Sequence, residues 1–276
     1  MFSFFKKWLA KGKENGFPFV DYPPHQIAIN PELSDVAQPL WKKIDQALTD
    51  TFKEKVFRNY QTKNPSITRE ELEWRWHELK KFFFLAVLFK QVPMFSKLVD
   101  DLWHEMILFT RDYHQFCERL GVKIEHEPHI APRFNPDERA YFDLIYSSFF
   151  QVEKATTYFY GEFFQYPLPE KVKTIFLQGD KQAFLSQYVR NTEQSRDIAE
   201  KLWTVLTKQM KESDSSADEK TSSPFGPLET HAYWVPTWFL LGNIPDRERD
   251  DGGAVYPWEN DSSDGSACSS CSGCSS

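Results

Sequence analysis

Apolar residues recur at helical spacing through the first part of the chain. From Asn30-Pro31 onward an apolar side chain stands at every fourth position, so these residues line one face of a helix. They are Leu40, Ile44, Leu48, Phe52 and Val56. Proline is tolerated in the first turn of a helix, so Pro31 fits the start, whereas Pro39 is a candidate break. The pattern predicts helical structure to about Tyr60.

A second helical pattern follows the turn at Asn64. Thr68 and Glu71 have the spacing of a capping box, in which side chains satisfy the first free amides of a helix. The apolar positions beyond them are Leu72, Trp76, Leu79, Phe83 and Val87. Pro93 stops this helix or follows its end. Another helical run extends from Ser96 to Leu120, after which Gly121 suits a C-terminal cap.

The later part of the chain continues the helical pattern. Asn135-Pro136 predicts a helix start, and the helix should reach about residue 152. Weaker patterns cover 169–178 and 180–189, and a stronger one covers 192–211. The sequence therefore predicts an all-α protein, with one irregular multi-helix domain at 31–211.

Four segments outside that domain have other compositions. Residues 1–30 read as an extended lead-in, and 212–226 are polar without core-forming residues, which predicts a flexible linker. The aromatic segment 227–244 is expected to dock on the domain. Residues 245–276 are acidic and then rich in Ser, Gly and Cys, so we expect a disordered tail.

Charge and hydropathy exclude some classes of partner. The net charge is -7 and the chain has no long basic run, so nucleic acid is not expected as a partner. The longest apolar run, Phe82 to Phe89, is far shorter than the ~20 residues that cross a bilayer, so no transmembrane segment is expected. The basic, aromatic start of the chain lacks the apolar core of a secretory signal. These features favour a cytoplasmic protein.

One segment, residues 78–129, carries a family resemblance. Its recognisable elements are Val99-Asp100-Asp101-Leu102-Trp103-His104, Phe109-Thr110-Arg111-Asp112-Tyr113, Phe116-Cys117, Gly121 and Ile124-Glu125-His126-Glu127-Pro128. In this order and spacing the segment resembles the bacterial glycine-rich domain-containing protein-like family. Relatives have two adjacent histidines before the proline; here Glu125 replaces the first, so only His126 carries over. The resemblance implies a helical fold and often a Gly- or Cys-rich tail, but no particular activity.

Polar residues of the same segment form a candidate metal site. Asp100 and His104, at i and i+4, share one helical face, and Cys117 and His126 complete a reasonable set of zinc ligands. In one straight helix His104 and Cys117 would stand about 20 Å apart, so a shared site requires a break near Thr110. Two alternatives need no metal: Asp100 and His104 belong to a buried polar network, and Cys117 is a small buried apolar residue.

Two functions of different kinds fit the sequence. The chain has no Gly-rich phosphate loop, GxSxG or HExxH motif, which favours an interaction or scaffold module with a protein partner. The alternative is a metal-binding protein or metal-dependent enzyme built around Asp100 and His104. A third role, binding of a soft metal or oxidation, rests on the tail alone, at Cys268, Cys271 and Cys274.

Overall fold

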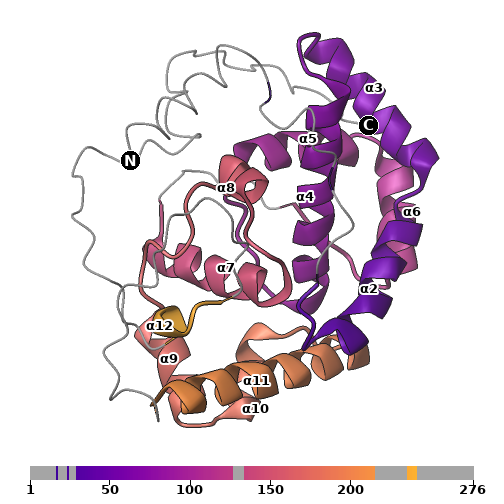
Figure 1. The fold of residues 1–276 in the computed structure, drawn as a ribbon. Coiled ribbons are helices and arrows are strands. Elements are labelled where there is room, and N and C mark those ends of the chain that lie inside the picture. Colours follow the sequence, from indigo (N-terminus) through magenta and orange to yellow (C-terminus); the bar gives the residue numbers. More distant parts are fainter. Residues whose placement is uncertain (1–16, 18–23, 25–28, 127–133, 215–234, 241–276) are drawn as a thin grey trace, which may run out of the picture.

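The protein is built from α-helices, and the predicted all-α class is confirmed (Figure 1). The computed structural model describes residues 17, 24, 29–126, 134–214 and 235–240. Two isolated β-bridges also join parts of the described chain, Ile29 with Phe150 and Phe89 with Val189. The helices are α2 (Ser34–Ala47), α3 (Asp50–Lys63), α4 (Arg69–Leu88), α5 (Lys97–Ile107), α6 (Thr110–Leu120), α7 (Pro136–Phe149), α8 (Lys154–Tyr160), α9 (Glu170–Leu177), α10 (Lys181–Tyr188), α11 (Glu193–Asp214) and α12 (Thr237–Leu240).

Helix α4 runs through the centre of the fold, with neighbours on every side (Figure 1). Three consecutive phenylalanines show why it is buried all round. The rings of Phe82 and Phe83 lie 5.0 and 5.7 Å from Trp103 of α5, and the ring of Phe84 lies 5.1 Å from Phe149 of α7. Successive residues point about 100° apart around a helix, so this triplet faces several elements at once. The part of α4 from Phe82 to Leu88 is apolar on all sides, and such a helical segment belongs in a core.

The first stretch predicted to be helical, which reaches about Tyr60, forms two helices. The break between them is not at Pro39. Pro39 lies inside α2, and the chain leaves helical geometry at Leu48. Thr49 then starts α3, because its side chain accepts a hydrogen bond from the amide of Phe52. The predicted apolar stripe is buried along both helices. The helix accommodates Pro39, and the capping side chain of Thr49 determines where the second helix begins.

The run from Ser96 to Leu120 is also divided into two helices. The side chain of Ser96 caps α5 by accepting from the amide of Val99. The chain turns at Leu108 and Phe109, and α6 begins at Thr110. The predicted break near Thr110 is therefore present, with Phe109 at the N-cap position and Thr110 as the first residue of α6. Gly121 ends α6 with φ 73°, the left-handed conformation expected of a glycine cap.

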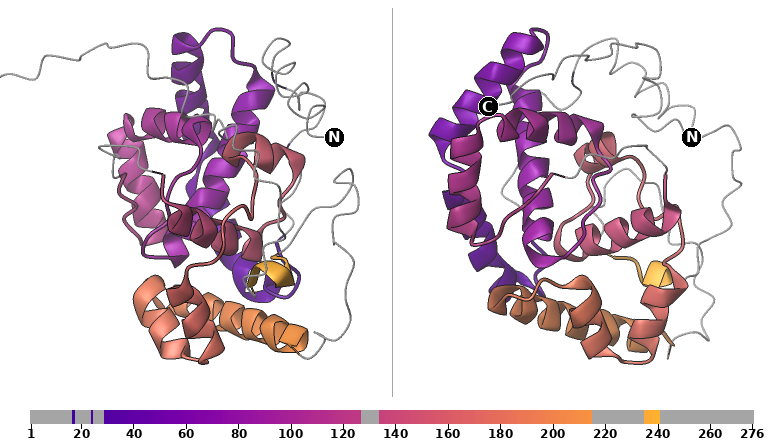
Figure 2. Two further views of the ribbon diagram at one scale, coloured as in Figure 1. Left: turned by 90° about the vertical axis from the view of Figure 1, so that its left-hand side faces the viewer. Right: turned by 180° about the vertical axis from the view of Figure 1, so that it is seen from behind.

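The last helices form a separate layer at one end of the fold (Figure 2). α9 and α10 pack with α11, which in turn contacts α2, α4 and α12. In α12, Phe239 is buried and its ring lies 4.8 Å from Phe164. α11 continues to Asp214, into the region expected to form a linker. The sequence pattern does not predict α8, a short helix of β-branched and aromatic residues.

Several predictions concern residues outside those that the structure describes. They include most of the lead-in, residues 215–226 of the expected linker and the whole 245–276 tail. The division into domain, linker and tail therefore stays a prediction. Within the described part, no helix combines the length and apolar character needed to cross a membrane.

Candidate metal centre

Three side chains from the family-like segment meet at one place. Asp100 and His104 come from α5, and His126 comes from the segment that follows α6. Each offers a ligand atom, and these atoms lie within 4.8 Å of one another. His126 Nε2 is 3.0 Å from Asp100 Oδ1, and the two imidazole rings are 4.2 Å apart, edge to face. One carboxylate and two imidazoles thus converge.

Helix α5 places the first two ligands on its outer face. Asp100 lies in the first turn, where a carboxylate is favoured by the helix dipole, and His104 lies one turn further on. The other face, which includes Leu102 and Trp103, is buried against the core. The amphipathic pattern therefore directs Asp100 and His104 away from the core.

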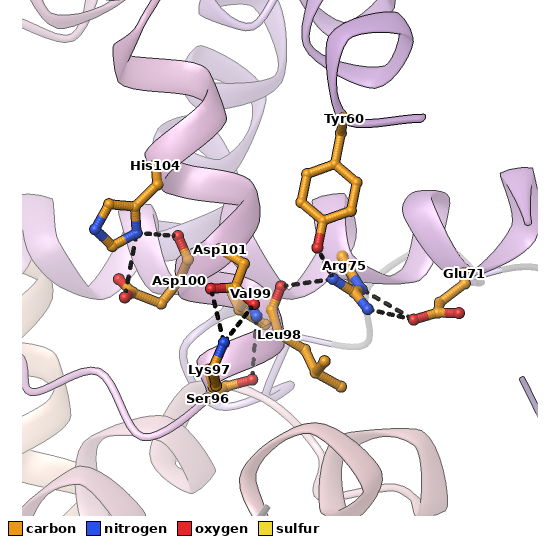
Figure 3. A network of polar contacts seen from close by, with 10 residues as sticks. All are labelled: Tyr60, Glu71, Arg75, Ser96, Lys97, Leu98, Val99, Asp100, Asp101 and His104. Atoms are coloured by element: carbon orange, nitrogen blue, oxygen red, sulfur yellow. Dashed lines mark hydrogen bonds and ion pairs between the residues drawn. The ribbon is translucent and has the colours of Figure 1, made fainter. Parts of the chain in front are cut away.

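The backbone of α5 also selects which nitrogen of the His104 ring donates a hydrogen bond (Figure 3). Its Nδ1 is 2.8 Å from the backbone oxygen of Asp100 and 3.3 Å from the carboxylate Oδ2. A carbonyl oxygen can only accept a hydrogen bond, so Nδ1 carries the proton. The lone pair of the neutral ring then lies on Nε2. Metal-binding histidines commonly use this arrangement, donating from one nitrogen and binding through the other.

His126 is brought back to α5 by the turn at Gly121. Ile124 is buried after that turn, and the His126 ring lies edge-on to Trp103, with 4.6 Å between the ring centroids. The exposed fraction of the side chain is 11% for His126, 28% for Asp100 and 48% for His104. The cluster is therefore closed on the side of Trp103 and open to solvent on the side of His104.

The geometry and the ligand types fit a single transition-metal ion. Ligands bonded at about 2.0–2.2 Å can be no more than about 4.4 Å apart. In tetrahedral geometry the same bonds place two ligand atoms about 3.4 Å apart, so the three side chains, whose ligand atoms lie within 4.8 Å of one another, would move together by about 1 Å to hold an ion. Imidazole with carboxylate suits Zn²⁺ or Fe²⁺, whereas Mg²⁺ and Ca²⁺ prefer oxygen ligands alone. An ion held here would keep coordination positions open toward solvent.

Cys117, the fourth ligand expected from the sequence, is not part of this group. It lies in α6 on the face that also carries Phe116 and Leu120, and all three side chains are buried. The predicted break near Thr110 exists, but it returns only His126 to α5. The apolar neighbours of Cys117 in the sequence, at helical spacing, were the signal that it faces the core.

A second polar cluster lies inside the core, between α4 and α7. Lys81 Nζ is 2.8 Å from Glu78 Oε1, and the hydroxyl of Tyr146 donates to Glu78 Oε2 at 2.7 Å and accepts from Lys81 at 3.0 Å. Nearby, Arg139 and Asp143 form a buried pair at 2.8 Å. We call these five residues the buried ionic cluster. The sequence did not predict it, because charged residues in a helix are usually solvated.

Part of the chain matches the model of a protein family. Residues 42–143 match the family model UCP032817-like, which describes an uncharacterised family. The matched region is less than half of the chain and includes all three ligands of the candidate centre. No curated protein and no solved structure matches the chain. The resemblance to the glycine-rich domain-containing protein-like family stays a prediction.

Proposed function

We propose that this protein binds a divalent transition metal, with Zn²⁺ as the reference ion, through Asp100, His104 and His126. The proposal rests on one observation, the convergence of three ligand atoms within 4.8 Å on a half-open face. The ion would take the place of the hydrogen atom between His126 Nε2 and Asp100 Oδ1. Because a metal binds imidazole only through an unprotonated nitrogen, binding should weaken in acid.

The number of ligands bears on what the metal would do. Structural zinc sites normally have four protein ligands and are closed, whereas catalytic sites have three and leave a position for water or substrate. With Cys117 outside the group, this centre has three, and the half-exposed His104 leaves the ion accessible. The arrangement favours metal-assisted chemistry or metal exchange over a purely structural ion.

The decisive experiment is titration of the full, chelator-treated chain with Zn²⁺ by calorimetry, together with elemental analysis. We expect one Zn²⁺ per chain and loss of that binding in His104→Ala. His114→Ala is the matched control, because His114 also faces a carboxylate four residues on, Glu118 at 3.2 Å, but no third ligand joins this pair among the described residues. A wild-type chain that binds no stoichiometric Zn²⁺, or a His104→Ala variant that binds it normally, would overturn the proposal.

Two further variants separate this centre from the other sites that the sequence suggested. Cys117→Ser should bind Zn²⁺ as the wild type does if the ligands are the three proposed here. Truncation before Ser262 removes Cys268, Cys271 and Cys274 and should also leave binding intact. Binding lost only on truncation would assign the metal to the tail.

The interaction module expected from the sequence has less support. Among the described residues, the large apolar side chains that are strongly exposed are Leu108 and Leu177, and they belong to different helical regions, at the end of α5 and in α9. Single exposed apolar residues are normal on monomeric proteins. A protein partner therefore stays a prediction, and the metal centre is the better supported function.

A further inference from the structure

The hydroxyl of Tyr113 joins three parts of the segment that carries the metal ligands. Tyr113 lies in α6. Its oxygen accepts a hydrogen bond from Trp103 Nε1 of α5 at 3.2 Å. The same hydroxyl donates to the backbone oxygen of Ile124 at 2.7 Å, beyond the Gly121 turn. One side chain thus connects α5, α6 and the segment that leads to His126.

Two of the contacts that position His126 lead to this hydroxyl. The backbone oxygen of Ile124 accepts the hydrogen bond from Tyr113. Ile124 is two residues before His126, so this bond fixes the path of the backbone that leads to His126. Trp103, which donates to Tyr113, is the surface on which the His126 ring rests. Phe82 and Phe83 hold the far side of Trp103 in the core. The position of His126 relative to Asp100 therefore follows from contacts that meet at Tyr113.

The Tyr113 hydroxyl is suited to this role because it keeps its proton. Burial raises the pKa of Tyr113 well above its usual value, and the neighbouring Cys117 adds to the effect. The hydroxyl can then donate to Ile124 and accept from Trp103 at every pH at which imidazole could bind a metal.

We infer that Tyr113 is a positioning residue of the metal centre and acts through His126. The inference rests on the proposed function. Tyr113 would not touch the ion. Replacement of residues that orient metal ligands typically weakens metal binding by about 10–100-fold, and removing the Tyr113 hydroxyl should fall in this range.

A double-mutant cycle on the full chain tests whether the effect passes through His126. Zn²⁺ affinity would be measured for the wild type, Tyr113→Phe, His126→Ala and the double variant by competition with a chromophoric chelator over a wide range of Zn²⁺ concentrations, so that the weak binding by the two remaining ligands is still quantified. We expect Tyr113→Phe to weaken binding by about 10-fold or more in the wild type and to have no further effect when His126 is absent. Equal weakening in both backgrounds, or no weakening in either, would overturn the inference.

Tyr60→Phe is the matched control for a general effect on the fold. The Tyr60 hydroxyl accepts a hydrogen bond from Arg75 at 2.6 Å (Figure 3) and has no link to His126 in the described contacts. Its removal should change stability but leave Zn²⁺ affinity within about 2-fold of the wild type. If both tyrosine variants lose affinity to the same extent, a positioning role for Tyr113 is ruled out.

A metal-free measurement keeps the two proposals separate. In the chelator-treated protein, the ring resonances of His126 should shift or broaden in Tyr113→Phe, whereas those of His114 stay unchanged. If the wild type binds no Zn²⁺, the proposed function fails, but these resonances still decide whether Tyr113 positions His126. Unchanged His126 resonances would overturn the inference even if the metal binds.

Discussion

Two polar clusters in this fold use similar residues in opposite ways. In the buried ionic cluster, Glu78 and Asp143 are fully buried, and each carboxylate has a cation and a second hydrogen-bond donor. In the candidate metal centre, the Asp100 carboxylate faces two imidazoles, and the cluster is open to solvent at His104. In the buried ionic cluster the charged groups are hydrogen-bonded to other groups of the protein. In the candidate metal centre the carboxylate and the two imidazoles could also bind a metal ion.

The buried ionic cluster also shows the energetic penalty of placing charged side chains in a core. Burial raises the pKa of Asp143 to about 6 although Arg139 lies beside it, because loss of water outweighs the attraction of the guanidinium. Buried ion pairs often add little net stability, yet removing one partner is strongly destabilising. The two clusters should therefore respond differently to substitution, and three measurements test that difference.

The largest effect is expected for Tyr146→Phe. The Tyr146 hydroxyl bridges Glu78 and Lys81, and its loss would leave buried charged groups short of a partner. We expect a fall of about 1–3 kcal/mol in the free energy of unfolding, measured with urea. Tyr141→Phe is the control, because the buried Tyr141 hydroxyl has no hydrogen-bond partner among the described residues. Equal effects of the two variants would mean that the bridge is not what stabilises the cluster.

A smaller effect is expected when the pH is changed. The quantity to measure is the difference in the free energy of unfolding between the wild type and Asp143→Asn at each pH. The folded pKa of Asp143, about 6, lies above its usual value of 3.8, so between these values the folded state binds the proton more tightly than the unfolded chain. This contribution is present at low pH and is lost as pH rises through 6. The wild type should therefore gain about 1 kcal/mol relative to the variant from pH 7 to pH 5. A difference that stays constant or moves the other way contradicts the raised pKa.

The smallest effect is expected for His104→Ala without metal. His104 is half exposed and its carboxylate partner is on the same helix, so the free energy of unfolding should change by less than about 0.5 kcal/mol. The same variant should lose Zn²⁺ binding. A large loss of stability in the chelator-treated variant would make the open cluster structural and remove the contrast with the buried one.

The sequence predicted most of the helices but fewer of the details that decide the site. Periodicity and end signals such as Thr68, Gly121 and Asn135 act over a few residues, so they can be read directly. The pair Asp100 and His104 was predictable for the same reason. The contact of His126 with Asp100 depends on how far α6 returns after the break, which local patterns do not specify. Cys117 has the chemistry of a zinc ligand, but it lies on the apolar face of α6 and is buried in the core, so it does not join the other three residues.

The buried ionic cluster was beyond sequence reasoning for a different reason. The segment that contains Glu78 and Lys81 is flanked by aromatic residues, but a charged residue in a helix is ordinarily taken to face water. Their burial follows from α4 being enclosed on all sides, which is a property of the assembled fold. Tyr146, which bridges the two charges, comes from a helix far away in the sequence.

The two clusters also differ in how far apart along the chain their contacting residues are. Asp100 and His126 are 26 positions apart, whereas Glu78 and Tyr146 are 68 positions apart. The entropy lost on closing a loop grows with its length, and contacts between nearby positions form faster. During folding, the helical hairpin that carries the three ligands can therefore close before the central core is complete. The three candidate ligands therefore come from one short stretch of the chain, whereas the buried charges find their partners only when distant parts of the chain meet.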